Sequence, residues 1–444
     1  MSVDDSGKTK RMAGLALWIL GMLFGLLVCF YAFVLSPLSM RNPADYYLGE
    51  IIGFMFAFIP AVTVYIWVPR IIDRFEPEPW WTLAMAFFWG AIGAMGFAYV
   101  INTVMSVVGG EIGFAIGGRS GANLGSQVLG ASISAPFVEE AMKGSFVLGM
   151  FLFLRSEFDG PVDGVIYGMF AALGFAMTEN MLYYSRALAD SHGGSAFAFQ
   201  FLLRGVLKPW GHPFYTAITG LGLGIARETH KPWLKWAAPI GCYFLAVMFH
   251  SGWNSASLVA GAVGVPEMVS LFLMLGLYFM IMLCFMGLVI GLVVREGKIL
   301  RANLRDEVLI GNLTQGEVDL VCSPIGRIKA RMQKGGAGVE FLITAARLGM
   351  MKWHLAAAMQ GQKMTMSGAE IVPLRQKLAA LKKQMGSNLA LSPHFPSTAE
   401  RPELGSRACA PRSARSPRSS RSLRFPRPPP PSTCPSRRAS STMA

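Results

Sequence analysis

Charged side chains are scarce in this 444-residue chain. They make up 15% of it, whereas a soluble globular domain carries about 25%. Hydrophobic residues account for 53% of the chain, and 27 of its residues are methionine. This composition argues against an ordinary soluble protein and indicates a membrane as the solvent.

Long polar linkers are also missing from the first 294 residues. About 20 consecutive apolar residues suffice to cross the hydrocarbon layer as a helix, and such stretches recur. We therefore predict an all-α integral membrane protein in which residues 1–294 form one multi-spanning domain without an internal repeat. About eight transmembrane helices are predicted, at 12–36, 48–68, 80–108, 126–154, 163–187, 209–226, 233–259 and 268–294.

Basic residues are rare in the segments that would face outward. Lysine and arginine concentrate on the cytoplasmic side of membrane proteins, and Lys8, Lys10 and Arg11 thus place the N-terminus in the cytoplasm. The loops predicted outside, 109–125 and 260–267, together hold one basic residue, Arg119. With eight spans the C-terminus is cytoplasmic too. The pattern predicts a multi-pass protein of the cell membrane, in contact with lipid.

Cysteine is sparse, with six residues and no CxxC spacing, so neither a disulfide framework nor a cysteine metal cluster is indicated. The formal charge of +14 does not indicate a nucleic-acid partner, because residues 401–444 hold ten arginines against one acidic residue. Residues 387–444, rich in Pro, Ser and Arg, are predicted to be disordered. Residues 295–386 are predicted to be a cytoplasmic region with amphipathic helices at 340–359 and 374–385.

Three ionisable residues stand out inside the fourth predicted span: Glu139, Glu140 and Lys143. A charge inside hydrocarbon costs roughly 2.5–3.5 kcal/mol on the insertion scale. A structural ion pair with Lys143 explains one glutamate but not two. Adjacent carboxylates in low dielectric resist being ionised together, and one that keeps its proton suits general acid–base chemistry. The pair therefore favours a catalytic role.

Further polar residues occur in the next three predicted spans. The fifth carries Glu179 next to Asn180, His212 opens the sixth, and His250 and Asn254 lie in the seventh. Each alone is compatible with a packing or hydrogen-bonding role. Counted along alternating spans, however, Glu139, Glu140, Glu179 and His250 fall at one depth, with His212 shallower. The fourth to seventh predicted spans thus place glutamate and histidine, which are common catalytic residues, at a similar depth in the membrane.

These motifs, in this order, resemble the PrsW family of intramembrane proteases, itself similar to the CAAX-prenyl endopeptidase superfamily. The resemblance covers about residues 70 to 295. It rests on Glu139-Glu140-x-x-Lys143, on the stretch from Phe158 to Gly168, on Gly174-Phe175-x-x-x-Glu179-Asn180, on His212-x-x-x-Thr216, and on His250-x-x-x-Asn254. Where the CAAX enzymes have histidine four residues after the phenylalanine, this chain has Glu179, as PrsW proteins do.

The resemblance implies hydrolysis of a peptide bond in a membrane-protein substrate, often a single-span regulator such as an anti-sigma factor. It implies that Glu139 activates water with Glu140 beside it, and that His250 and Asn254 bind the developing oxyanion. Glu179, His212 and His250 would form a plausible two-His, one-carboxylate Zn²⁺ set. No His-Glu-x-x-His motif is present, so a metal-dependent and a metal-free mechanism stay equally open.

Two other classes of function remain open from the sequence. An ion- or proton-coupled transporter also uses buried carboxylates, although the missing internal repeat weakens that interpretation. A non-catalytic membrane scaffold would retain the fold but not need Glu139. The substrate and the oligomeric state are not specified by the sequence.

Overall fold

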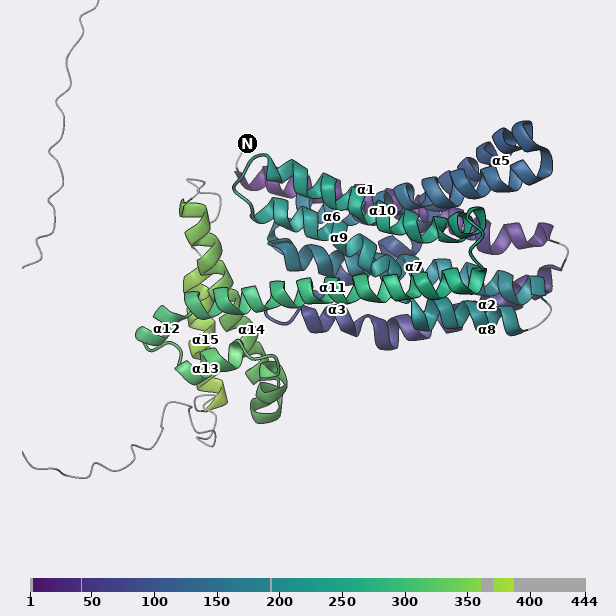
Figure 1. Cartoon of the computed structure of the whole chain (residues 1–444). Helices are drawn as coiled ribbons and strands as arrows, with labels where there is room; N and C mark the ends of the chain where they lie inside the picture. The colour runs from purple at the N-terminus through teal and green to yellow at the C-terminus, as the bar shows by residue number, and fades with distance from the viewer. Residues whose placement is uncertain (1–2, 41, 192–193, 361–369, 387–444) are drawn as a thin grey trace, which may run out of the picture. The chain divides into compact units, whose positions relative to one another are not determined.

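The computed structural model describes residues 3–40, 42–191, 194–360 and 370–386. Every regular element within these ranges is a helix, which confirms the predicted all-α class. The predicted disordered segment, 387–444, lies outside the described residues. Figure 1 shows the long helices lying side by side, with the helices after α11 gathered at one end of the bundle.

The α-helices fall into two groups along the chain. The membrane part contains α1 (Val3–Phe30), α2 (Pro43–Pro60), α3 (Trp67–Ile72), α4 (Trp80–Phe88), α5 (Met95–Ser126), α6 (Ala135–Phe153), α7 (Pro161–Ser191), α8 (Gly194–Gln200), α9 (Gly211–Glu228), α10 (Leu234–Ala262) and α11 (Glu267–Asn303). After it come α12 (Arg305–Leu309), α13 (Gln315–Val321), α14 (Gly326–Gln360) and α15 (Ile371–Met385).

Several helices are joined by short stretches with a different pitch. The π-helical stretches are η1 (Tyr31–Leu35), η3 (Ala61–Tyr65), η4 (Trp89–Ala94), η5 (Gln127–Ser134) and η7 (Phe201–Leu207). The 3₁₀ stretches are η2 (Ser36–Ser39) and η6 (Arg155–Glu157). A π-helical turn adds a residue and shifts the helix face that follows; η5 does this directly before α6.

Each of the eight predicted spans coincides with helical structure. Within the described residues, five helical stretches are long and apolar enough to cross a membrane: Lys8–Ser39, Pro43–Ile72, Trp80–Phe153, Pro161–Ala189 and Glu267–Leu309. The third of these contains two predicted spans, whereas α9 and α10 are not among the five. The chain is therefore a multi-pass helical membrane protein, and the number of spans stays a prediction.

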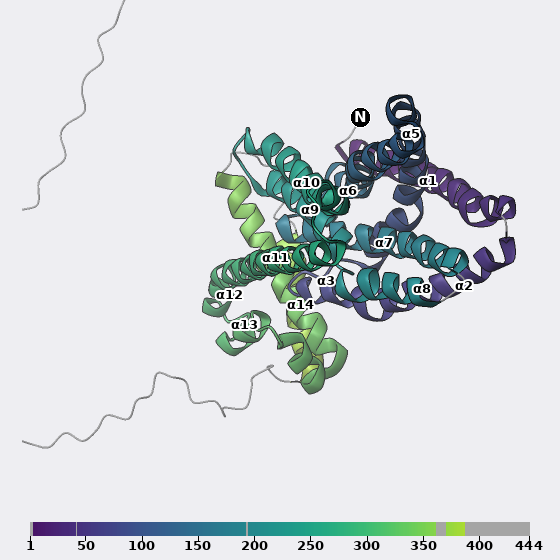
Figure 2. The same cartoon turned by 45° about the vertical axis from the view of Figure 1, so that its right-hand side comes forward.

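Helices α7 and α9 form the centre of the bundle (Figures 1 and 2). Helix α7 contacts α9, α2, α4 and η4, and α9 contacts α10 and α6. Nearly all of α9 from Gly211 to Ala226 is buried. A helix surrounded by other helices does not meet lipid, so it can carry glycines, threonines and a histidine instead of a continuous apolar surface.

Small residues at four-residue spacing bring α7 and α9 into backbone contact. A Cβ added at Gly164 would lie 2.1 Å from the carbonyl oxygen of Gly220, and one added at Gly168 would lie 2.6 Å from that of Thr216. Gly224 meets the start of α7 in the same way. Small residues at such intervals permit close helix crossing in membranes. These contacts fix the position of α9 along the axis of α7.

We predict that Gly164→Val weakens this crossing. The added side chain meets backbone atoms that cannot move aside, so the variant should lose about 3 kcal/mol of stability, the upper end for an overpacked core. The thermal unfolding midpoint in detergent, followed by tryptophan fluorescence, measures the loss. Gly276→Val in α11 is the control, because a Cβ there meets nothing within 4 Å; equal midpoints for the two variants would contradict the prediction.

The segment 109–125, predicted to be an external loop, is instead a helical hairpin within α5. Only Gly117 and Gly118 depart from helical geometry, and Gly118 has a φ of 64°. A Cβ at Gly113 would lie 2.0 Å from the carbonyl oxygen of Gly121. Because glycines let the two arms touch through their backbones, the chain reverses in two residues. The loop prediction was wrong for this reason.

The helices after α11 share an apolar core with the end of α11 and with Phe75; it includes Leu300, Leu313, Phe341 and Leu378. The two predicted amphipathic segments, 340–359 and 374–385, fall within α14 and α15 and are helical as expected. Helix α11 itself runs past residue 294 to Asn303 without interruption. The membrane part and the following helices are thus joined by one continuous helix.

Candidate active site and metal centre

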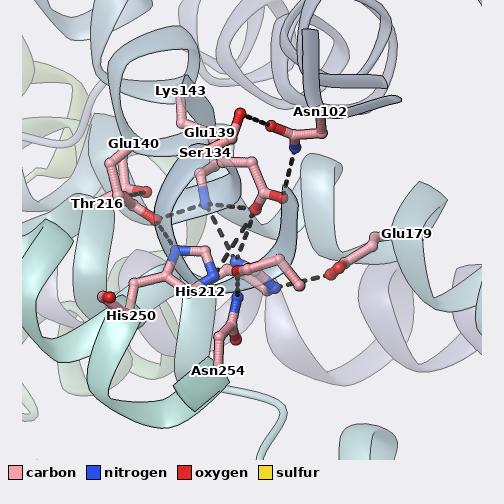
Figure 3. Close-up of polar contacts among 12 residues, drawn as sticks. Asn102, Ser134, Glu139, Glu140, Lys143, Glu179, His212, Thr216, His250 and Asn254 are labelled. Atoms are coloured by element: carbon pink, nitrogen blue, oxygen red, sulfur yellow. Dashed lines mark hydrogen bonds and ion pairs between the residues drawn. The ribbon is translucent and has the colours of Figure 1, made fainter. Parts of the chain in front are cut away.

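The residues singled out in the sequence converge from four helices (Figure 3). Helix α7 contributes Glu179, α9 contributes His212, and α10 contributes His250 and Asn254, while α6 contributes the remaining acidic and basic side chains: Glu139, Glu140 and Lys143. Glu139, Glu140, Lys143, His212 and His250 are all at most 9% exposed. The predicted convergence is therefore present in the structure.

Glu140 is fully buried and accepts hydrogen bonds from three other residues. Its Oε1 lies 2.7 Å from Lys143 Nζ and 3.0 Å from His250 Nδ1. Its Oε2 accepts from the Thr216 hydroxyl at 2.8 Å. A carboxylate with these partners is held in one position and has little capacity left for a reactant, so Glu140 acts as the anchor of α6, α9 and α10.

His212 lies between Lys143 and Glu179. Its Nδ1 is 3.1 Å from Lys143 Nζ, and its Nε2 is 2.7 Å from Glu179 Oε2. Arg204 of η7 pairs with Glu179 and donates to Asn180 Oδ1 at 2.8 Å. Since an ammonium can only donate, Nδ1 carries the lone pair and Nε2 the proton. Glu179 thus fixes the tautomer of His212.

Glu139 differs from the other two carboxylates because one of its oxygens lacks a hydrogen-bond partner. Asn102 donates to Oε1 at 3.3 Å. Oε2 is buried and, among the described residues, accepts no hydrogen bond. It lies 3.8 Å from Lys143 Nζ, 3.9 Å from His212 Nδ1 and 3.8 Å from His250 Nε2. Buried polar atoms are rarely left unsatisfied, which points to a water or ion at this place.

The donors around this place could hold a divalent metal if His212 Nδ1 exchanged its contact with Lys143 Nζ for the ion. Ligand atoms of Glu139, His212 and His250 lie within 4.8 Å of one another. Each imidazole has its other nitrogen at a carboxylate, Glu179 or Glu140, which is how second-shell groups orient metal-binding histidines. One carboxylate and two imidazoles is a known catalytic zinc set. In this group Glu139 takes the place predicted for Glu179, which lies behind His212.

Asn254 lines the same cavity as His250, but its amide is already engaged. Its Nδ2 donates to the backbone oxygen of Ala131 at 2.9 Å. His250 likewise has Nδ1 at Glu140, with Nε2 facing Glu139. With its proton on Nδ1, His250 offers no N–H on the Glu139 side, whereas the Asn254 amide has a second N–H besides the one that Ala131 accepts. The oxyanion role of His250 and Asn254 stays a prediction.

Two cavities meet at the site. One of about 610 Å³ is lined by α10, η7 and the start of α11, and one of about 810 Å³ is lined by the two arms of α5 together with α6 and α7. Glu139 and Glu179 border both cavities. Glu139 therefore lies where the two cavities adjoin.

Two residues of the site were not predicted. Arg204 is a single cation in an otherwise apolar stretch, and Asn102 is a single amide in the third predicted span. The rule that marked Glu139, a polar group within a predicted span, would have found Asn102, whereas Arg204 falls between the predicted spans 163–187 and 209–226. Ser134 supports Asn102 by donating to its Oδ1 at 2.9 Å.

The fold and the site together define a polytopic helical membrane protein with a buried Glu/His centre. Residues 78–296 match the model of a family described as PrsW family intramembrane metalloprotease. This region, which contains the whole site, is similar to that family. The resemblance inferred from the motifs is thereby confirmed.

Curated relatives carry the same family name. A protein named Protease PrsW from Halalkalibacterium halodurans is 33% identical over 132 residues, which cover 30% of this chain and 56% of that protein. The namesakes from Geobacillus kaustophilus and Bacillus subtilis are 28% and 30% identical, over 39% and 37% of this chain and 67% and 65% of theirs. The matched region thus spans little more than half to two thirds of these relatives. No solved structure matches the chain.

We predict that Lys143→Met destabilises the protein by about 3–5 kcal/mol, because removing one member of a buried ion pair leaves the carboxylate of Glu140 without its cation. The shift of the thermal midpoint in detergent measures the effect. The double variant Lys143→Met/Glu140→Gln should recover part of the loss, since both charges are then absent. A single variant as stable as the wild type would contradict the role given to Lys143.

We also predict that the purified chain, stripped with a chelator, takes up one Zn²⁺. Glu139→Ala or His250→Ala should abolish uptake, and Glu179→Ala should weaken it by about 10- to 100-fold, as loss of a second-shell group does. Metal content by mass spectrometry and competition with a chromophoric chelator provide the readout. Glu111→Ala, at an exposed position in α5, is the control; uptake unchanged in all variants would reject this ligand set.

Proposed function

We propose that the chain is an intramembrane endopeptidase that hydrolyses a peptide bond in a membrane-embedded substrate protein. The observation that carries this proposal is the free oxygen of Glu139, held among His212, His250 and Lys143 where two cavities meet. The match of residues 78–296 to the PrsW family model and the protease names of the relatives support it.

Hydrolysis at this place needs a water molecule beside the scissile carbonyl. Glu139 Oε2 takes one proton of the water as its oxygen bonds to the carbonyl carbon, and the same proton passes to the leaving nitrogen as the C–N bond breaks. The Lys143 ammonium offsets the negative charge that develops nearby. The products are a carboxylic acid and an amine, which become a carboxylate and an ammonium when the remaining proton moves between them, and Glu139 is regenerated.

The same residues can hold Zn²⁺ instead, with Glu139, His212 and His250 as ligands. The metal would then supply Lewis-acid chemistry at this place. Glu179 and Glu140 would keep the two imidazoles in the required tautomers in either case. The two routes lead to one reaction and differ in their response to a chelator.

We further propose that the substrate is a single-span membrane protein, such as an anti-sigma factor, and that the enzyme resides in the plasma membrane. A substrate embedded in the bilayer can reach a site at this depth by lateral movement, without leaving the lipid. The proposed partners are therefore a membrane protein and the bilayer itself.

The proposal is tested by cleavage of a library of single-span peptides in detergent and in liposomes. Wild type should cut at least one peptide, with the position identified by mass spectrometry. Glu139→Gln should slow cleavage by about 10²- to 10⁴-fold, the usual contribution of a general base, and more if the metal is also lost. Glu111→Gln should leave the rate unchanged.

A chelator separates the two mechanisms, because loss of cleavage that zinc restores selects the metal-dependent one. Thermal midpoints of all variants show whether each is folded. If wild type cleaves no peptide while liposomes show ion flux that requires Glu139, the chain is a transporter and the peptidase proposal is rejected.

A further inference from the structure

Lys208 brings a positive charge into the cavity of about 610 Å³. The residue lies between η7 and α9 and lines this cavity together with Glu139 and His250. Among the residues that the structure describes, no group forms a hydrogen bond or an ion pair with its ammonium. Instead, Nζ lies 3.9 Å from the centre of the Trp253 ring and 5.5 Å from that of Tyr215. Attraction between a cation and the faces of aromatic rings holds it there.

The other cations near the reacting carboxylate are already engaged. Lys143 is paired with Glu140, and Arg204 is paired with Glu179. Each of these charges is neutralised where it stands, whereas the contacts described for Lys208 are with aromatic rings. A charge inside a membrane protein is costly without a counter-ion. A ligand that supplies the opposite charge would offset this cost, so Lys208 is placed to bind an anion.

The first turn of α9 adds to the positive potential at this place. A Cβ added at Gly211 would lie 2.7 Å from Lys208 Cε and 3.1 Å from its Nζ, so the end of the lysine lies against the start of this helix. The N-terminus of a helix carries partial positive charge, which favours an anion and disfavours a cation. Glu267 is a further carboxylate among the described residues of the cavity wall, and no ion pair joins it to Lys208. An anionic ligand therefore fits here.

Hydrolysis of a peptide bond generates an anion of this kind. When water adds to the scissile carbonyl, negative charge develops on the carbonyl oxygen, and a donor already in place lowers the barrier. His250 offers no N–H on the Glu139 side, because its Nδ1 proton faces a carboxylate. Asn254 follows Trp253 in α10 and lines the same cavity, and its amide has a second N–H besides the one already donated.

We infer that the Lys208 ammonium binds this oxyanion beside the amide of Asn254, and that Lys208 is a further catalytic residue. As Glu139 takes a proton from the water, the water oxygen bonds to the carbonyl carbon, and the π electron pair of the C=O bond moves onto its oxygen beside the ammonium. The pair returns to the C–O bond when the C–N bond breaks and the proton passes to nitrogen. Lys208 keeps its protons throughout. This assignment rests on the proposed function and adds a group that stabilises the developing charge directly.

The rate of cleavage tests this role. Lys208→Met keeps an unbranched side chain over Trp253 and removes the charge, so kcat should fall by about 10²- to 10³-fold, as for the loss of one oxyanion donor. KM should stay within about threefold, because the interaction forms only in the transition state. Lys208→Arg should stay within about tenfold of wild type, since a guanidinium also rests on aromatic rings. Lys298→Met is the control: it removes an exposed lysine of α11 outside the cavity wall and should leave kcat unchanged.

Thermal midpoints in detergent separate catalysis from folding. A lysine that mainly stabilises the fold should lower the midpoint when it is removed, as predicted above for Lys143→Met. Lys208 has no carboxylate partner among the described residues, so Lys208→Met should leave the midpoint unchanged or raise it, as is common when a functional group is removed. A loss as large as that of Lys143→Met would show a structural role and overturn the assignment.

Binding of a charged analogue gives a measurement that needs no turnover. A phosphinate in place of the scissile bond carries a negative oxygen where the oxyanion would form. In metal-free protein, prepared with a chelator, wild type should bind this analogue at least about tenfold more tightly than Lys208→Met does, because transition-state analogues depend on the contacts of the transition state. The parent peptide, measured in the Glu139→Gln background, should bind equally with and without Lys208→Met.

The outcomes distinguish this residue from the reaction itself. If wild type cleaves no peptide, phosphinate analogues of the library serve as the probe: binding that requires Lys208 would uphold the anion site and reject the peptidase. Normal kcat in Lys208→Met would uphold the peptidase and reject the assignment. A loss confined to KM for peptides with acidic side chains would reject it too, because Lys208 would then select substrates. Analogue binding that is absent or independent of Lys208 overturns the assignment in every case.

Discussion

Charge buried in a hydrocarbon environment must be neutralised by a nearby partner, and the Lys143 ammonium meets this constraint for three helices at once. It donates to Glu140, lies beside His212 and stays within 4 Å of Glu139. Glu140 in turn holds His250 and Thr216. The surroundings of Glu139 Oε2 therefore depend on this lysine, directly or through Glu140, whereas Glu139 Oε1 is held by Asn102.

Much of the fold and most of the site could be predicted from the sequence. Long apolar stretches predict helices, because a chain that crosses lipid must satisfy its backbone hydrogen bonds internally and an α-helix does so within one segment. Glu139, Glu140, Glu179 and the histidines were recognisable because each is expensive where it stands. The prediction was strong because the hydrocarbon interior of a membrane makes a polar residue costly, so each polar residue in a span indicates a specific role.

The remaining features could not be predicted because they depend on contacts between distant segments. Which carboxylate stays free was settled by hydrogen bonds that no spacing reveals: Glu179 is taken by Arg204 and His212, leaving Glu139 to face the imidazoles. The segment 109–125 is predicted to be a loop because it lies between two predicted spans, and its sequence does not show that it forms a helical hairpin. Only the facing arm shows that the glycines of this segment serve close packing.

The arrangement of charges also bears on how the chain enters the membrane during synthesis. Helix α6 brings a cation for its own carboxylate, since Glu140 and Lys143 are three residues apart. Helix α7 carries Glu179 with no such partner within itself; its cation, Arg204, and His212 come later in the chain. We therefore expect α6 to pass from the translocon into the bilayer without another helix. Glu179 of α7, in contrast, meets its partners only after η7 and α9 have been synthesised. We expect residues 161–228 to enter the membrane together.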